Sequence, residues 1–148
     1  MPLTTVAPAA VLRAESEASK SALRGRDHVH ITHFPFNVGR ESRSRGYDAL
    51  KRDFDRRLGS AKSINDLYLI DGGDSLHISR EHFRVDWING RLVIVDRGSH
   101  SGTIVAGKRI GIGQPTDDVE VLDGDTIVVG HSKSPYVFRF QIENGARP

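Results

Sequence analysis

The chain of 148 residues contains no cysteine, so it can form neither a disulfide framework nor a metal site with thiolate ligands. It also lacks any run of about eighteen apolar residues, the length that a membrane-spanning helix requires. The N-terminal segment has no basic start followed by a long apolar core, so no secretory signal is expected. These absences predict a cytoplasmic protein with no membrane partner.

The chain also has no large excess of charge of one sign. The formal net charge is +2, which by itself is too small to indicate a nucleic-acid partner. The charge is unevenly distributed, because residues 40–62 carry eight Lys or Arg and only four Asp or Glu. A local positive field suits a small anionic group better than a long polyanion.

Short apolar runs separated by turn residues make up most of the chain after Asp66. In 82–88 and 136–142 apolar and polar residues alternate, which is the period of a half-buried strand. Asn-Gly at 89–90 predicts a hairpin turn between two such runs. The expected strands are 66–70, 82–88, 91–96, 103–107, 125–130 and 136–142, with further strands in 9–15, 28–31 and 34–38. Many short strands at close spacing favour an all-β sandwich or barrel.

One segment has a helical pattern instead. Its apolar residues, three or four positions apart, are Tyr47, Leu50, Phe54 and Leu58. Oppositely charged residues four apart support the same helix. The pattern predicts a short amphipathic helix near 47–58, within an inserted segment at 41–63.

Four stretches in order resemble the forkhead-associated (FHA) domain, a phosphothreonine-peptide reader. They are VGR (38–40), NDLYL (65–69) leading to ISREH (78–82), DRGSHSGT (96–103) and LDGDTIVVG (122–130). The resemblance implies an all-β, FHA-like β-sandwich of ten or eleven strands with the helical insertion. We expect it to form a single domain at 9–143, between flexible tails at 1–8 and 144–148.

The resemblance also implies a binding site. A phosphate dianion needs charged and hydroxyl donors that converge from a rigid frame. By the resemblance, Arg40 and Ser79 contact the phosphate and Arg80 assists them. His100 and Ser101 lie in the loop on which the peptide docks. The residues implied as structural support are Gly39, His82, Gly98 and Gly102.

The sequence departs from the family pattern in the turn at 96–103 and in the connection between Arg40 and Asn65. Ser101 stands where the family has an Asn that holds the backbone of the bound peptide, and a serine cannot make the paired contact of an amide. His100 stands where the family often has a small hydroxyl residue. In addition, twenty-four residues separate Arg40 from Asn65, where the family usually has only a few.

The predicted function is therefore a non-catalytic phosphothreonine-peptide binding module, an adaptor in Ser/Thr protein kinase signalling. Its partner would be a phosphothreonine-containing protein, a Ser/Thr protein kinase or a kinase substrate. One alternative is an FHA-fold scaffold that binds a protein independently of phosphorylation. A second alternative is a nucleic-acid-binding module built on the helix at 47–58, although acidic residues balance the basic ones there.

No enzyme, cofactor or metal site is expected. The chain has no P-loop, no G-x-S-x-G and no HExxH motif. The turn at 96–103 resembles a serine-hydrolase elbow, but His100 occupies the position of the nucleophile. His28, His30 and His33 have no carboxylate at the spacing of a metal ligand.

Overall fold

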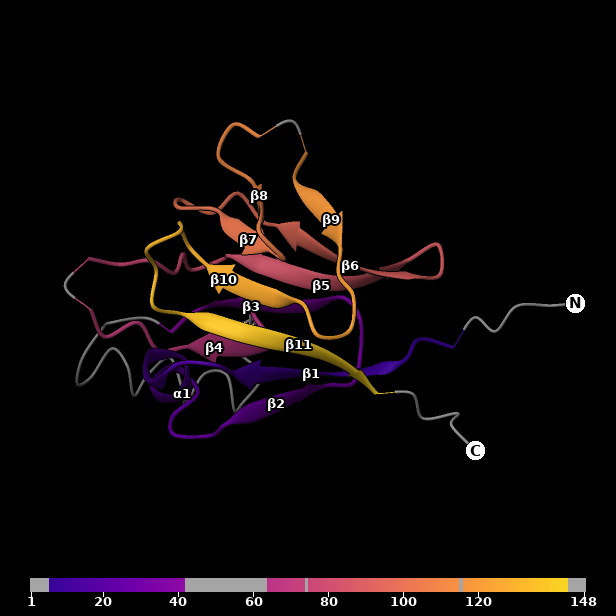
Figure 1. The fold of residues 1–148 in the computed structure, drawn as a ribbon, viewed down its shortest axis with the longest axis horizontal. Helices are drawn as coiled ribbons and strands as arrows, with labels where there is room; N and C mark the ends of the chain where they lie inside the picture. The colour runs from indigo at the N-terminus through magenta and orange to yellow at the C-terminus, as the bar shows by residue number, and fades with distance from the viewer. Residues whose placement is uncertain (1–5, 42–63, 74, 115, 144–148) are drawn as a thin grey trace, which may run out of the picture.

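The computed structural model describes residues 6–41, 64–73, 75–114 and 116–143. Within these ranges the chain forms eleven strands and one short helix, and the strands make two sheets (Figure 1). The predicted all-β sandwich is confirmed. The helix predicted near 47–58 lies outside the described residues.

The larger sheet has six strands and is antiparallel throughout. Its strands are β1 (Ala9–Ala14), β2 (His28–Ile31), β7 (Thr103–Val105), β8 (Lys108–Ile110), β10 (Thr126–Val129) and β11 (Val137–Glu143). They lie in the order β2-β1-β11-β10-β7-β8, so the first and last strands of the described chain are neighbours.

The second sheet contains the strands that lead into the predicted site. Its strands are β3 (Phe36–Arg40), β4 (Leu67–Leu69), β5 (Phe83–Ile88), β6 (Arg91–Asp96) and β9 (Asp118–Glu120), in the order β4-β3-β5-β6-β9. All pairs are antiparallel except β3 and β4. The predicted hairpin at 89–90 joins β5 to β6, and both turn residues have positive φ, 52° and 76°.

The core lies between the two sheets and follows the predicted alternation. Phe83 and Val85 of β5 are fully buried, and so are Phe138 and Phe140 of β11. Each of these side chains belongs to the face of its strand that is turned to the other sheet. Complete burial of one such apolar side chain contributes about 1.5–3 kcal/mol.

The helix α1 (Glu17–Ala22), which lies between β1 and β2, was not predicted from the sequence. The helix begins at Ser16, whose hydroxyl accepts the N–H of Ser19 at 3.1 Å. At its other end, the carbonyl of Ala22 accepts the N–H of Ile70 at 3.1 Å. This bond connects α1 to the segment after β4. Nowhere in the described chain is a helix long and apolar enough to cross a membrane.

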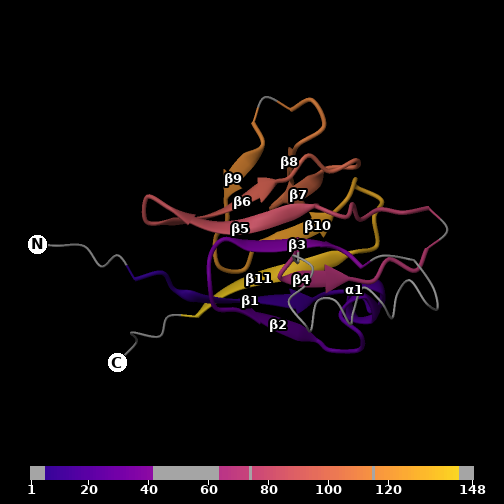
Figure 2. The same ribbon diagram turned by 180° about the vertical axis from the view of Figure 1, so that it is seen from behind.

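The connections that carry the predicted site residues meet at one end of the sandwich. Figure 2 shows α1 and the segment after β4 at this end, whereas the β5–β6 turn lies at the opposite end. Loops at the end of a stiff sandwich are free to vary in sequence and commonly carry binding residues. We call this the loop end.

Candidate functional site

Backbone hydrogen bonds bring three of the predicted site residues together at the loop end. The N–H of Arg40, at the end of β3, donates to the carbonyl of Ser79 at 2.9 Å. The hydroxyl of Ser79 accepts the backbone N–H of His100 at 2.8 Å. Arg40, Ser79 and His100 therefore lie side by side, although they come from three separate segments of the chain.

Two arginines lie at this point, Arg40 and Arg80, and no carboxylate of the described residues neutralises them. Arg40 uses Nη1 to donate to the carbonyl of Ile78 at 3.2 Å, and its Nε is buried without a hydrogen-bond partner within the described ranges. Arg80 is exposed, and neither arginine forms an ion pair with another described residue. By contrast, Glu41 pairs with Arg24 at 3.2 Å.

His82 is fully buried behind this cluster. Its Nδ1 accepts the N–H of Ser79 at 2.9 Å, so the ring hydrogen lies on Nε2, which donates to the carbonyl of Gly102 at 2.8 Å. Burial lowers the pKa of His82 below its usual value, which favours the neutral ring that these two bonds require. His82 thus connects the segment that carries Ser79 to the segment that carries His100.

The turn at 96–103 is folded around a buried carboxylate. Asp96 accepts the N–H groups of Gly98 and Ser99 at 3.1 and 3.0 Å, and the hydroxyls of Ser99 and Thr103 at 2.7 and 2.8 Å. Gly98 and Gly102 have φ of 81° and 85°, which glycine adopts without steric cost. The hydroxyl and glycine residues of this turn therefore determine its shape, and none of them is arranged as a nucleophile.

Ser101 is held between two loops. Its hydroxyl donates to the carbonyl of His77 at 2.7 Å. The side chain of His100, the preceding residue, is exposed. The turn at 96–103 is therefore fixed to the β4–β5 connection through Ser101, and the imidazole of His100 faces solvent beside Ser79.

The β4–β5 connection is itself fixed by Asp71, which the sequence did not single out. This buried carboxylate accepts the N–H groups of His77 and Ile78 at 2.6 and 3.0 Å and the hydroxyl of Tyr136 at 2.9 Å. Burial alone would raise the pKa of Asp71, but these hydrogen bonds outweigh it and the pKa is lowered. The ring of His77 lies 5.0 Å from that of His131, from the β10–β11 connection.

Comparison with known families agrees with this arrangement. The family model of the FHA domain matches residues 56–130, about half of the chain. The chain belongs to the FHA domain family. The match contains Ser79, His82 and the turn at 96–103, but it begins after Arg40. No curated protein matches the chain in sequence.

Solved FHA domains share this fold. The solution structure of the FHA domain of an Arabidopsis thaliana hypothetical protein has a TM-score of 0.61 and 21% identity, over 100% of this chain and 97% of that one. The kinase-interacting FHA domain of the Arabidopsis kinase associated protein phosphatase KAPP has a TM-score of 0.58 and 17% identity, over 95% of this chain and 98% of that one. Mycobacterium tuberculosis EmbR, in complex with a low affinity phosphopeptide, has a TM-score of 0.55 and 24% identity, over 95% of this chain and 26% of that one.

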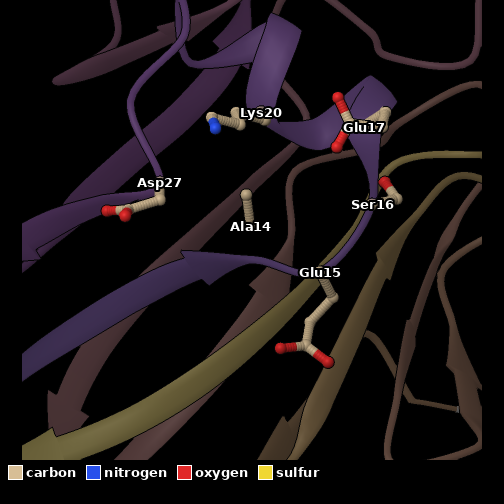
Figure 3. A pocket seen from close by; sticks show the side chains of 6 residues that line it. All are labelled: Ala14, Glu15, Ser16, Glu17, Lys20 and Asp27. Carbon is tan, nitrogen blue, oxygen red and sulfur yellow. The ribbon is translucent and has the colours of Figure 1, made fainter.

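This FHA domain also has a hollow of about 430 Å³ beside α1, and neither Arg40 nor Ser79 lines it (Figure 3). The residues that line it are Ala14, Glu15, Ser16, Glu17, Lys20 and Asp27. The carboxylate of Asp27 is bound by His28 at 2.5 Å, which lowers the pKa of Asp27. No cluster of three or more His, Asp or Glu side chains in the described ranges could hold a metal ion.

Two polar residues of the site were not recognised from the sequence. Asn65 was noted only as part of a motif, yet its amide group donates to the carbonyl of Arg80 at 2.8 Å. Arg97 was likewise noted only as part of the stretch at 96–103, because an arginine after a strand is usually solvated. The Asp-x-Gly motif at 96–98 could have identified Asp96, since the side chain of an aspartate often accepts the backbone N–H of the residue two positions later.

Proposed function

We propose that this FHA domain is a non-catalytic module that binds phosphothreonine peptides and acts as an adaptor in Ser/Thr protein kinase signalling. The observation that carries the proposal is the cluster of Arg40, Ser79 and Arg80 at the loop end. It offers two cations without ion-pair partners in the described ranges, next to a serine hydroxyl.

The donors of this cluster match the needs of a phosphate dianion. A guanidinium has five N–H donors, and Arg40 uses one of them on the carbonyl of Ile78. Because the oxygen of the Ser79 hydroxyl accepts from His100, its own hydrogen can point outward to a phosphate oxygen. Charge-assisted hydrogen bonds of this kind are about twice as strong as neutral ones.

The surrounding structure fixes the backbone that carries the Ser79 hydroxyl before a ligand arrives. His82 fixes the N–H of Ser79, and the carbonyl of Ser79 is bound by Arg40. Fixed donors lose little conformational entropy on binding, which favours recognition of a small group such as phosphate. The choice of threonine and the kinase-signalling role are supported by the family. The phosphopeptide bound to EmbR supports phosphopeptide binding, and the kinase-interacting domain of KAPP supports the kinase-signalling role.

Ser101 favours a second candidate function, a scaffold that binds its partner without phosphorylation. Its hydroxyl hydrogen is donated to the carbonyl of His77, so it is not available to hold the backbone of a peptide. A module without that contact would depend on other surfaces for its partner.

A calorimetric titration tests the proposal. The full chain is titrated with a library of phosphothreonine peptides, and with the same peptides unphosphorylated or carrying phosphoserine. Binding that requires phosphothreonine supports the proposed function. Equal binding of phosphorylated and unphosphorylated peptides supports the scaffold, and binding to duplex DNA alone contradicts both.

A further inference from the structure

Arg97, the residue after β6, places its guanidinium against several segments of the loop end. The side chain is 11% exposed. Nη1 donates to Oδ1 of Asn65 at 2.5 Å and to the carbonyl of Val38 at 3.4 Å. Nη2 donates to the carbonyl of Ile64 at 3.0 Å and to Oε1 of Glu81 at 3.1 Å. One side chain thus connects β3, the segment just before β4 and the β4–β5 connection.

The contact with Asn65 determines how that residue is oriented. A guanidinium has donors only, so the amide oxygen of Asn65 must face Arg97. The amide nitrogen then faces the other way, where it donates to the carbonyl of Arg80 at 2.8 Å. Asn65 is buried, with 5% of its surface exposed, so a flipped amide would leave two polar groups without partners.

The carbonyl that Asn65 holds belongs to the segment that presents the phosphate-binding groups. Ser79 precedes Arg80 directly, and the carbonyl of Ser79 accepts the N–H of Arg40. A shift of the Arg80 carbonyl would therefore move the Ser79 hydroxyl relative to Arg40. In addition, the backbone N–H of Arg97 donates to the carbonyl of His82 at 2.9 Å, at the other end of the same segment.

We infer that Arg97 is a positioning residue for the phosphate-binding segment at 79–80, and that it acts through Asn65. The inference rests on the proposed function and adds a residue to it that does not touch the ligand. A lysine cannot replace Arg97, because an ammonium group lacks the planar fork that reaches acceptors on several segments at once.

A double-mutant cycle tests the inference with the strongest phosphothreonine peptide of the titration. Arg97→Lys and Asn65→Ala should each weaken binding roughly five- to tenfold, the effect of about one lost oriented hydrogen bond. The double variant should bind no more weakly than the weaker single variant, because both changes break the same connection. Losses that multiply, or Arg97→Lys with wild-type affinity, would overturn the inference.

Two further variants make the cycle interpretable. Arg91→Lys changes the arginine at the start of β6, at the far end of the strand from Arg97. Arg91 pairs with Glu120 at 3.7 Å, and the variant should bind as the wild type does. Asn65→Asp keeps an acceptor for Arg97 but has no donor for the carbonyl of Arg80. It should bind as weakly as Asn65→Ala, and it replaces that variant in the cycle if Asn65→Ala does not fold.

Amide hydrogen exchange in the ligand-free protein separates this inference from the proposed function. Arg97→Lys should speed exchange at the N–H groups of Arg40 and Ser79, but not at that of Val129, which binds the carbonyl of Tyr136 in the other sheet. An equal increase at all three would mean that Arg97 only stabilises the fold, and no change would also overturn the inference. If the wild type binds no phosphopeptide, the proposed function fails, yet the exchange pattern still tests the positioning role.

Discussion

A Cβ atom on Gly39 would lie 1.9 Å from the carbonyl oxygen of Arg80. No real side chain tolerates such a distance, so the end of β3 and the segment at 79–80 are in direct backbone contact. This contact places Arg40, the next residue, beside Ser79. The glycine of the Gly-Arg pair is therefore required by close approach, and not by an unusual φ.

Gly39→Ala should lower both stability and binding. The new methyl group must displace a backbone carbonyl that Asn65 also holds, and we expect a loss of about 3 kcal/mol in the free energy of unfolding. Urea denaturation measures this loss. Gly72→Ala is the matched control, because nothing lies within 4 Å of its Cβ position and the free energy should change by less than about 0.5 kcal/mol. Equal stability of the two variants would contradict the packing seen at Gly39.

Arg40→Ala should abolish phosphate-dependent binding while the protein stays folded. Removing a charged partner from a largely desolvated contact costs roughly 2–4 kcal/mol of binding free energy. Calorimetry with a phosphothreonine peptide and its unphosphorylated form measures the loss. A folded Arg40→Ala protein with unchanged affinity would show that the phosphate is not bound at Arg40, and an unfolded one would show that Arg40 serves the fold.

The fold could be predicted largely from the alternation of apolar residues. Strands such as β5 and β11 turn alternate side chains to the core, which buries Phe83, Val85, Phe138 and Phe140 and partly buries Trp87 and Ile142. Their period is therefore visible in the sequence. The strands β8 and β9 were missed because each has three residues, most of them charged and exposed. The helix α1 was missed because six residues do not establish a helical period.

The site was less predictable, because much of it depends on tertiary contacts. The sequence motifs identified Arg40, Ser79 and His100, which the structure places together. They could not show that Arg97 turns inward, since the acceptors of its guanidinium are carbonyls and side chains distant in the sequence. Nor could they show that Ser101 is bound to His77, because a serine hydroxyl serves many partners equally well.

His82 should make stability depend on pH. The pKa of His82 is lowered in the folded protein. An unfolded histidine has a pKa of about 6.5, so below that pH the unfolded state binds a proton that the folded state does not bind. The stability contributed by His82 is therefore fully present above that pH. It is lost as the pH falls toward the folded pKa, by at most about 1.4 kcal/mol per pH unit.

The variant His82→Ala measures this contribution. At neutral pH it should lower the free energy of unfolding by about 2–4 kcal/mol, because the N–H of Ser79 and the carbonyl of Gly102 lose their partner. The difference from the wild type should shrink between pH 7 and pH 5 in urea denaturation. A difference that is constant over this range would mean that His82 titrates normally in the folded protein.

The last prediction concerns Ser101, at the position of the family asparagine. The serine has one hydroxyl hydrogen and gives it to the carbonyl of His77 at 2.7 Å. An asparagine has two amide hydrogens, so Ser101→Asn could keep that contact and still donate to the backbone of a peptide. One additional hydrogen bond contributes about 0.5–1.5 kcal/mol, so affinity for a phosphothreonine peptide should rise about two- to tenfold. Ser101→Ala is the control and should bind more weakly than the wild type, because the turn at 96–103 then loses its bond to the β4–β5 connection. A folded Ser101→Asn protein with unchanged affinity would show that this turn does not contact the peptide backbone, and the phosphorylation-independent scaffold would then be the better account of the domain.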